Sequence, residues 1–302
     1  MLNLPDHVTI KEVGPRDGLQ NEPKEIAAED KVAWINQLSD TGLSSIEISS
    51  FVHPKWIPQL KDAAQVAASI KRKPGITYAA LVPNQKGLEA ALTADVDEVA
   101  VFMSASETHN RKNINKTIDE TFPVLEDVIQ TAKREGKQVR GYVSTVFECP
   151  YDGKTSKDQV LRVSDRLLRM GIDELSMGDT IGTADPKQVD EALYYWKKHL
   201  PLENLAMHFH NTRGMALANV IVSLQHGITT FDASLGGLGG CPYADGASGN
   251  LATDDLVHML HRMGIHTGID EKALQKAAGY MQRVLGKTLP SHGMQILNKE
   301  RV

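Results

Sequence analysis

Short β-rich runs alternate with helix-length segments along the chain. The β-rich runs span residues 8–13, 45–50, 77–82, 96–104, 138–147, 172–177, 205–210 and 229–235. Between the first two, apolar residues such as Val32, Ile35 and Leu38 recur at helical spacing. Several helical segments end in a glycine just before the next run, as in "TGLSSIEI" and "REGKQV", where a left-handed cap is expected. This repetition predicts successive β-α-β units.

Eight such units in a chain of 302 residues predict an α/β fold, a (β/α)8 TIM barrel. A doubly wound open sheet is the alternative, but the first strand leads into "GPRDGLQNEP" and not into a Gly-rich dinucleotide loop. Helical sequence near 252–263 and 270–285 predicts a last barrel helix and additional C-terminal helices. We expect one catalytic domain over 1–302, with the barrel at about 5–265 and the extension at about 266–302.

Charge and composition exclude several classes of protein. The chain has 33 Lys and Arg against 38 Asp and Glu, a formal charge of -5, which disfavours nucleic acid or an anionic membrane as the main partner. With two cysteines, Cys149 and Cys241, a disulfide framework is not indicated. The N-terminus shows no signal or transit pattern, and no apolar run approaches the roughly 20 residues of a membrane span. A soluble, cytoplasmic protein is expected.

Polar residues gather where the predicted strands end, which is where barrels of this kind carry their active sites. Strand one is expected to finish with Arg16 and Asp17, strand two contains Glu47, strand seven carries His208 and His210, and the loop after strand eight contains Cys241 and Asn250. Residues two apart on a strand point to the same side, so both histidines are expected to face the barrel mouth. Two polar residues without a metal are the structural alternative for "HFH" by itself.

The other strand-end residues favour a metal. Asp17, His208, His210 and Asn250 combine oxygen and imidazole donors without a thiolate, which suits Mg²⁺ or Mn²⁺ and leaves about two octahedral positions for a substrate. Arg16 would be costly beside a cation unless it met an anion. We therefore interpret Arg16 as a stabiliser of an oxyanion or enolate, held by Glu47.

The segment "GGLGGCPYADGASGN" (236–250) is rich in glycine but matches neither nucleotide-binding signature. A flexible connection is the simplest interpretation. A small-residue loop that closes over the site fits better, because Cys241 at its centre can act as an acid or base once its pKa is tuned.

With these segments in hand, the chain closely resembles the 3-hydroxy-3-methylglutaryl-CoA (HMG-CoA) lyase family. The resemblance rests on "EVGPRDGLQNE" (12–22), "IEISSFVHPKWIPQ" (46–59), "HFHNTRG" (208–214) and "GGLGGCPYADGASGNLATDDLV" (236–257), and runs from about residue 5 to about 286. The resemblance assigns Asp17, His208, His210 and Asn250 to the metal, Arg16 to enolate stabilisation, Glu47 to positioning Arg16, Cys241 to proton transfer, and Gln20, Asn113 and Tyr142 to the substrate or its support. It implies that Asp17 and His208 also take part in catalysis.

The implied reaction is metal-assisted cleavage of HMG-CoA to acetyl-CoA and acetoacetate, as in leucine degradation or ketone-body formation. A cation makes loss of the tertiary hydroxyl proton accessible, and Arg16 stabilises the enolate that forms. The expected partner is an acyl-CoA, and a homodimer is expected. Unlike animal members, the segment after residue 286 has no cysteine for cross-linking subunits.

Two other functions stay open. One is a related synthase that condenses a 2-oxoacid with acetyl-CoA, although such enzymes usually carry a long regulatory region for which this chain has little room. The other is a catalytically dead barrel that serves as a binding protein, which would require a lost ligand or acid. Every expected position is filled.

Overall fold

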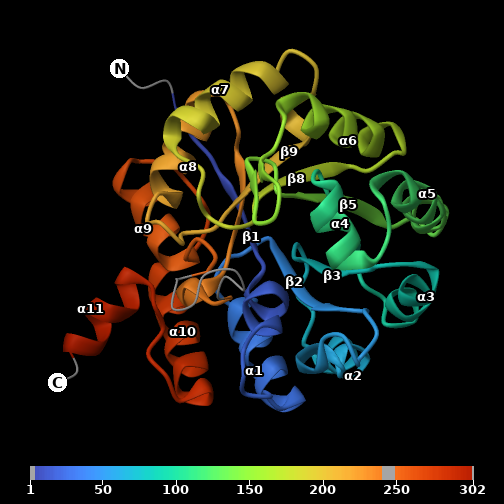
Figure 1. Ribbon diagram of the computed structural model, residues 1–302. Coiled ribbons are helices and arrows are strands. Elements are labelled where there is room, and N and C mark those ends of the chain that lie inside the picture. Colours follow the sequence, from blue (N-terminus) through green and yellow to red (C-terminus); the bar gives the residue numbers. More distant parts are fainter. Residues whose placement is uncertain (1–3, 240–248, 301–302) are drawn as a thin grey trace.

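A closed barrel of parallel strands forms the centre of the molecule (Figure 1). The computed structural model describes residues 4–239 and 249–300. In these residues the barrel order is β1-β10-β9-β8-β5-β4-β3-β2. The strands are β1 (Thr9–Glu12), β2 (Ser45–Ser50), β3 (Thr77–Leu81), β4 (Glu98–Ser104), β5 (Gln138–Ser144), β8 (Glu174–Asp179), β9 (Leu205–Phe209) and β10 (Thr230–Ala233). The predicted TIM barrel is confirmed, and the open sheet is excluded.

Helices surround this barrel (Figure 1). They are α1 (Ala28–Leu38), α2 (Ala63–Ser69), α3 (Gln85–Thr93), α4 (Glu107–Ile114), α5 (Ile118–Arg134), α6 (Lys157–Arg169), α7 (Pro186–Trp196), α8 (Ala216–Gln225) and α9 (Thr253–Arg262). Local sequence explains their starts: Thr117 and Glu120 form a capping box at α5, and Asp185 and Gln188 form one at α7. Within the described ranges, no helix is both long and apolar enough to cross a membrane.

The glycines before the strands have the predicted conformation. Gly42 has φ +90°, and a Cβ there would lie 2.2 Å from the carbonyl oxygen of Gly268. Gly171 likewise has φ +97°. Both positions are in the left-handed region that favours glycine, so each ends a helical segment and turns the chain back toward the barrel.

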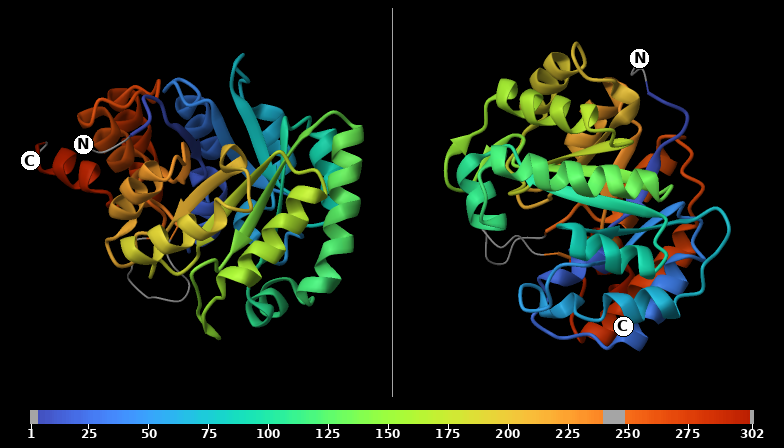
Figure 2. Two further views of the ribbon diagram at one scale, coloured as in Figure 1. Left: turned by 90° about the horizontal axis from the view of Figure 1, so that it is seen from above. Right: turned by 90° about the vertical axis from the view of Figure 1, so that its right-hand side faces the viewer.

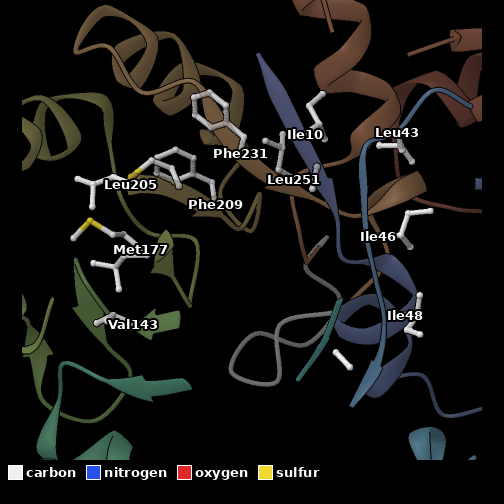
Figure 3. Packing of buried hydrophobic residues seen from close by; sticks show 14 of the residues in the cluster. Ile10, Leu43, Ile46, Ile48, Val143, Met177, Leu205, Phe209, Phe231 and Leu251 are labelled. Atoms are coloured by element: carbon white, nitrogen blue, oxygen red, sulfur yellow. The ribbon is translucent and has the colours of Figure 1, made fainter. Parts of the chain in front are cut away.

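The apolar core lies between the strands and the helices. Trp34, Trp196, Phe209 and Phe231 are fully buried in it, and Figure 3 shows Phe209 and Phe231 beside Leu205. Such burial supplies roughly 25 cal/mol per Å² of apolar surface and anchors the strands from outside.

The barrel interior is unusually rich in charge. Lys11 Nζ lies 3.0 Å from carboxylate oxygens of both Glu98 and Glu174. Arg140 lies 2.5 Å from Glu174 and 2.7 Å from Asp232. Buried charges require partners of this kind, and here the partners come both from the adjacent strand, as for Arg140 and Glu174, and from across the barrel, as for Arg140 and Asp232.

Two helices, α10 (Glu271–Leu285) and α11 (His292–Glu300), extend the chain beyond the barrel helices. Helix α10 packs against α1 and α9, and Figure 2 shows this C-terminal part along one side of the barrel. Lys287 pairs with Glu22 at 2.6 Å. Ser291 donates to Asp254 at 2.6 Å, and its N–H donates to the carbonyl oxygen of Gly236 at 3.1 Å. The extension thus contacts the turns that follow β1 and β10.

Several strand ends differ from the sequence prediction, and those of β1, β5 and β9 lie beside the predicted site residues. Strand β1 ends at Glu12, so Arg16 and Asp17 do not finish the strand but lie in a helical turn, η1 (Gly14–Gly18). Strand β5 ends at Ser144, because Thr145 adopts a left-handed φ of +59°. Strand β9 ends at Phe209, and His210 instead forms an isolated bridge with Asn250.

Candidate active site

The turn η1 places Arg16 and Asp17 at the barrel mouth. Its N–H groups fold back onto one carbonyl, with Asp17 N–H donating to Val13 at 2.7 Å. The buried carboxylate of Glu12 lies beneath the turn and accepts hydrogen bonds from Gly14 N–H at 2.8 Å, Leu235 N–H at 2.9 Å and the Thr253 hydroxyl at 2.7 Å. Glu12 therefore joins the turn after β1 to the one after β10.

Three of the predicted metal ligands converge. Asp17, His208 and His210 each offer a ligand atom, and these atoms lie within 4.8 Å of one another. Asn250 joins them by donating from Nδ2 to Asp17 Oδ2 at 2.8 Å. The buried atoms Asn250 Oδ1 and His210 Nδ1 have no hydrogen-bond partner in the described part of the chain. Orphaned buried donors and acceptors carry a free-energy cost, so this donor set fits a divalent cation.

The protonation states suit a cation. Burial would raise the pKa of Asp17, but Arg16 and His208 outweigh it and hold the pKa below its ordinary value. Burial and the neighbouring His208 lower the pKa of His210 to about 4. Asp17 is therefore ionised and His210 neutral near pH 7, as metal ligands must be.

Arg16 is held on two sides. Its Nε donates to Glu47 Oε2 at 2.7 Å, and its Nη1 lies 2.5 Å from Asp17 Oδ1. Burial opposes the charge of Arg16, but the two carboxylates outweigh burial and raise the pKa of the guanidinium. Arg16 and Glu47 are therefore in contact, and the roles expected of them stay predictions.

A hydrogen-bonded chain continues from Glu47 across the barrel. The Tyr142 hydroxyl donates to Glu47 Oε2 at 3.2 Å and accepts from Arg140 Nη1 at 2.8 Å. Arg140 Nη2 donates to Asp232 Oδ1 at 2.7 Å, and Asp232 Oδ2 lies 3.1 Å from His208 Nδ1. The far end of this chain, His208 Nε2, lies 3.8 Å from Asp17 Oδ2. Asp17 and His208, which face each other across this distance, are two of the residues that would hold the cation.

Sequence analysis missed Arg140 and Asp232. The available signal was a charged residue inside each of two buried strands, in "QVRGYV" and "TTFDAS". Which charges meet depends on register and curvature: Asp232 is the register partner of His208, whereas Arg140 comes from β5. The contact between Arg140 of β5 and Asp232 of β10 crosses the barrel interior, and local sequence does not encode it.

A cavity of about 610 Å³ opens beside the candidate metal position. Its wall includes the predicted residues Arg16, Asp17, Gln20, Asn113, Tyr142, His208 and His210. Gln20 also donates to Asp17 Oδ1 at 2.6 Å. Asn113 lies in α4 and is exposed, so it belongs to the outer part of the cavity wall and not to the metal cluster.

The two cysteines differ. Cys149 lies in a small hairpin, β6 (Glu148–Cys149) and β7 (Gly153–Lys154), and is buried. Its sulfur accepts from the N–H groups of Tyr151 and Asp152, both at 3.4 Å. Cys241, the predicted proton donor, lies outside the described residues.

Known proteins resemble this chain over nearly its whole length. The family model HMGL-like matches residues 7–280. The hydroxymethylglutaryl-CoA lyase YngG of Bacillus subtilis is 57% identical over 292 residues, covering 97% of this chain and 98% of that protein.

Solved structures of HMG-CoA lyases also resemble this chain over nearly its whole length. The crystal structure of the Bacillus subtilis HMG-CoA lyase superposes with a TM-score of 0.97 at 57% identity, covering 98% of this chain and 99% of that chain. An HMG-CoA lyase from Acinetobacter baumannii in complex with coenzyme A and 3-methylmalate has a TM-score of 0.91 at 41% identity, covering 95% and 94%. The chain therefore belongs to the HMGL-like family.

Proposed function

We propose that this protein is a lyase that cleaves HMG-CoA to acetyl-CoA and acetoacetate. The observation that carries the proposal is the convergence of Asp17, His208 and His210 beside Arg16 at the mouth of the barrel, next to a cavity of about 610 Å³. Relatives at 57% and 47% identity bear the names of hydroxymethylglutaryl-CoA lyases. A related lyase binds coenzyme A, which supports an acyl-CoA as the substrate.

Asp17, His208, His210 and Asn250 are the residues that would hold the cation, and the absence of a thiolate favours Mg²⁺ or Mn²⁺. When bound, the cation polarises the substrate hydroxyl so that its proton can leave near neutral pH. Asp17 borders the cavity beside the proposed cation position and is the side chain that we propose to accept this proton, while His208 takes part in catalysis by holding the cation.

Cleavage of the C2–C3 bond leaves acetoacetate and the enolate of acetyl-CoA. Arg16 is a fixed positive charge whose pKa is raised, and it borders the cavity. A preorganised donor of this kind stabilises the developing enolate oxygen most strongly in a site from which water is excluded. Glu47 sets the direction of the guanidinium through the 2.7 Å contact.

The enolate carbon must then receive a proton. We propose Cys241 as the donor, since the chain's other cysteine, Cys149, is buried in the hairpin and does not border the cavity. Tyr142 and Gln20 serve as positioning residues, because they bond to Glu47 and Asp17 respectively. Asn113 contacts the outer part of the substrate.

The whole chain acts as one catalytic domain in this proposal, since the C-terminal extension bonds to the segment after β1 through Lys287 and to the turn after β10 through the N–H of Ser291. The homodimer and the cytoplasmic location stay predictions from the sequence. Sedimentation velocity at micromolar concentration measures the first directly.

A coupled assay for acetoacetate release from HMG-CoA with Mg²⁺ tests the function. The matched reaction is a 2-oxoacid plus acetyl-CoA, which a synthase would consume with release of free coenzyme A. Acetoacetate release from HMG-CoA alone supports the lyase. Turnover in the condensation assay alone, or in neither assay with metal bound, contradicts it.

A further inference from the structure

The carboxylate of Asp232 connects the charged interior of the barrel to the candidate metal position. It lies in β10 as the register partner of His208 in β9, and its side chain is fully buried. Its Oδ1 accepts from Arg140 Nη2 at 2.7 Å, and its Oδ2 accepts from the Ser176 hydroxyl at 2.7 Å and from Arg140 Nη1 at 3.2 Å. His208 Nδ1 lies 3.1 Å from the same Oδ2.

These contacts determine which ring nitrogen of His208 carries the proton. Both terminal nitrogens of Arg140 and the Ser176 hydroxyl donate to the two oxygens of Asp232, which is the arrangement of a carboxylate paired with a guanidinium. An ionised carboxylate only accepts hydrogen bonds, so His208 Nδ1 must donate. In a neutral imidazole the other nitrogen then keeps its lone pair, and that atom, Nε2, is the one that faces Asp17 Oδ2 at 3.8 Å.

His210 lacks this support. In residues 4–239 and 249–300 no hydrogen bond or ion pair joins either of its ring nitrogens to a carboxylate, and its buried Nδ1 has no hydrogen-bond partner among these residues. The two histidines lie side by side, with ring centroids 5.3 Å apart, but a carboxylate orients just one of them. The contrast makes Asp232 a support for His208 specifically and not a general feature of the "HFH" segment.

We propose that Asp232 is a positioning residue that fixes His208 as the Nδ1–H tautomer and directs Nε2 at the cation, with Arg140 and Ser176 holding Asp232 in place. The inference rests on the metal site of the proposed function but not on the identity of the substrate. Partners of this kind orient a ligating histidine, and losing one typically costs roughly 10- to 100-fold in metal affinity.

The direct test is the tautomer of His208 in the metal-free protein. Long-range ¹H–¹⁵N correlations, recorded at a pH where the imidazole is neutral, distinguish the two tautomers. The wild type is expected to show the proton on Nδ1. In Asp232→Asn, the amide oxygen is expected to stay on Arg140 and the amide NH₂ to face His208, so the proton should move to Nε2.

Mn²⁺ binding, measured by calorimetry without substrate, gives the second readout. We expect Asp232→Asn to weaken Mn²⁺ binding by roughly 10- to 100-fold. Glu174→Gln is the matched control, because Glu174 also bonds Arg140, at 2.5 Å, but does not contact His208. It should leave both the tautomer and the Mn²⁺ affinity unchanged.

A wild-type spectrum with the proton on Nε2 would overturn the proposal, even if Asp232→Asn did not fold. So would a folded Asp232→Asn protein with wild-type affinity for Mn²⁺. If both readouts follow the expectation while HMG-CoA is not cleaved, the proposed function fails and the role of Asp232 stands.

Discussion

Arg16 Nε donates to Glu47 Oε2 across 2.7 Å, and both side chains are buried, with Arg16 bordering the cavity. The contact fixes a positive charge at the wall of the cavity, where the proposed mechanism forms an enolate. In the proposed mechanism Arg16 acts on the substrate, whereas the two histidines hold the metal. Variants of Arg16 and of His208 should therefore differ in whether they lose turnover alone or metal binding as well.

Arg16→Gln should keep the metal and lose turnover. Removing one preorganised donor typically lowers kcat by about 10²- to 10³-fold, because its interaction is stronger in the transition state than with bound substrate. His208→Ala should instead weaken Mn²⁺ binding and turnover together. Calorimetry with Mn²⁺ and steady-state kinetics on both variants provide the comparison, and equal loss of metal in the two would show that our division of roles is wrong.

Glu47→Ala should act through Arg16. We expect a kcat reduced roughly 10- to 100-fold with Mn²⁺ affinity retained, since an arginine without its supporting carboxylate is less well oriented. Glu47→Gln, which can still accept from Arg16, should recover part of the activity. A Glu47→Ala enzyme with wild-type kcat would contradict the positioning role.

Removal of the metal should abolish activity reversibly. The donor set of Asp17, His208 and His210 suits a hard cation, so dialysis against EDTA should inactivate the enzyme, and Mg²⁺ or Mn²⁺ should restore it. Binding to the folded state also stabilises it. The melting temperature should therefore rise with Mn²⁺ in the wild type but not in His208→Ala. Full activity in excess EDTA would refute the metal mechanism.

Glu12 predicts a pH dependence of stability. Burial raises its pKa from 4.5 to about 7, although hydrogen bonds from Thr253, Leu235 and Gly14 oppose the shift. Between these values the folded protein holds a proton that the unfolded chain has released, so this group lowers the free energy of unfolding as the pH rises. At 1.36 kcal/mol per pKa unit, the loss between pH 5 and 8 is roughly 2 to 3 kcal/mol.

Urea unfolding of the wild type and Glu12→Gln at both pH values measures this loss. Glutamine does not titrate and can still accept from the two N–H groups. The difference in unfolding free energy between the two proteins should therefore shift by that amount in favour of the variant at pH 8. A difference that does not depend on pH would place the pKa of Glu12 near its ordinary value.

Much of the fold could be predicted because each unit carries its own local signals. The alternation of strand and helix sequence and the glycines such as Gly42 and Gly171 depend on neighbouring residues alone. Strand ends were less accurate: nothing in "EVGPRDG" shows that the chain leaves the sheet at Glu12 and forms a helical turn before Asp17.

The candidate site likewise contains some contacts that local sequence predicts and others that it does not. His208 and His210 could be paired from strand periodicity, because residues two apart share a face. The contact between Asp232 and His208 depends on the register between two strands, and that of Arg140 with Asp232 on closure of the barrel. Such contacts join residues far apart in sequence, and no local pattern predicts them.

Cys241 provides the last prediction. If it protonates the enolate, Cys241→Ser should keep the fold and the metal and lose activity by the roughly 10²- to 10⁴-fold typical of a missing general acid. Cys149→Ser is the matched control, because the Cys149 sulfur is buried and accepts two backbone hydrogen bonds at 3.4 Å that a hydroxyl can also accept. It should cost much less.

Alkylation distinguishes the two thiols chemically. A thiol reagent should inactivate the wild type by labelling Cys241, and an acyl-CoA analogue should protect against it, because a ligand that occupies the site shields a residue that acts on the substrate. The buried Cys149 should react slowly. Mass spectrometry of the labelled peptides identifies the site. Near wild-type turnover of Cys241→Ser, or inactivation that follows labelling of Cys149 alone, would remove Cys241 from the mechanism and assign the proton to water or to another group bordering the cavity.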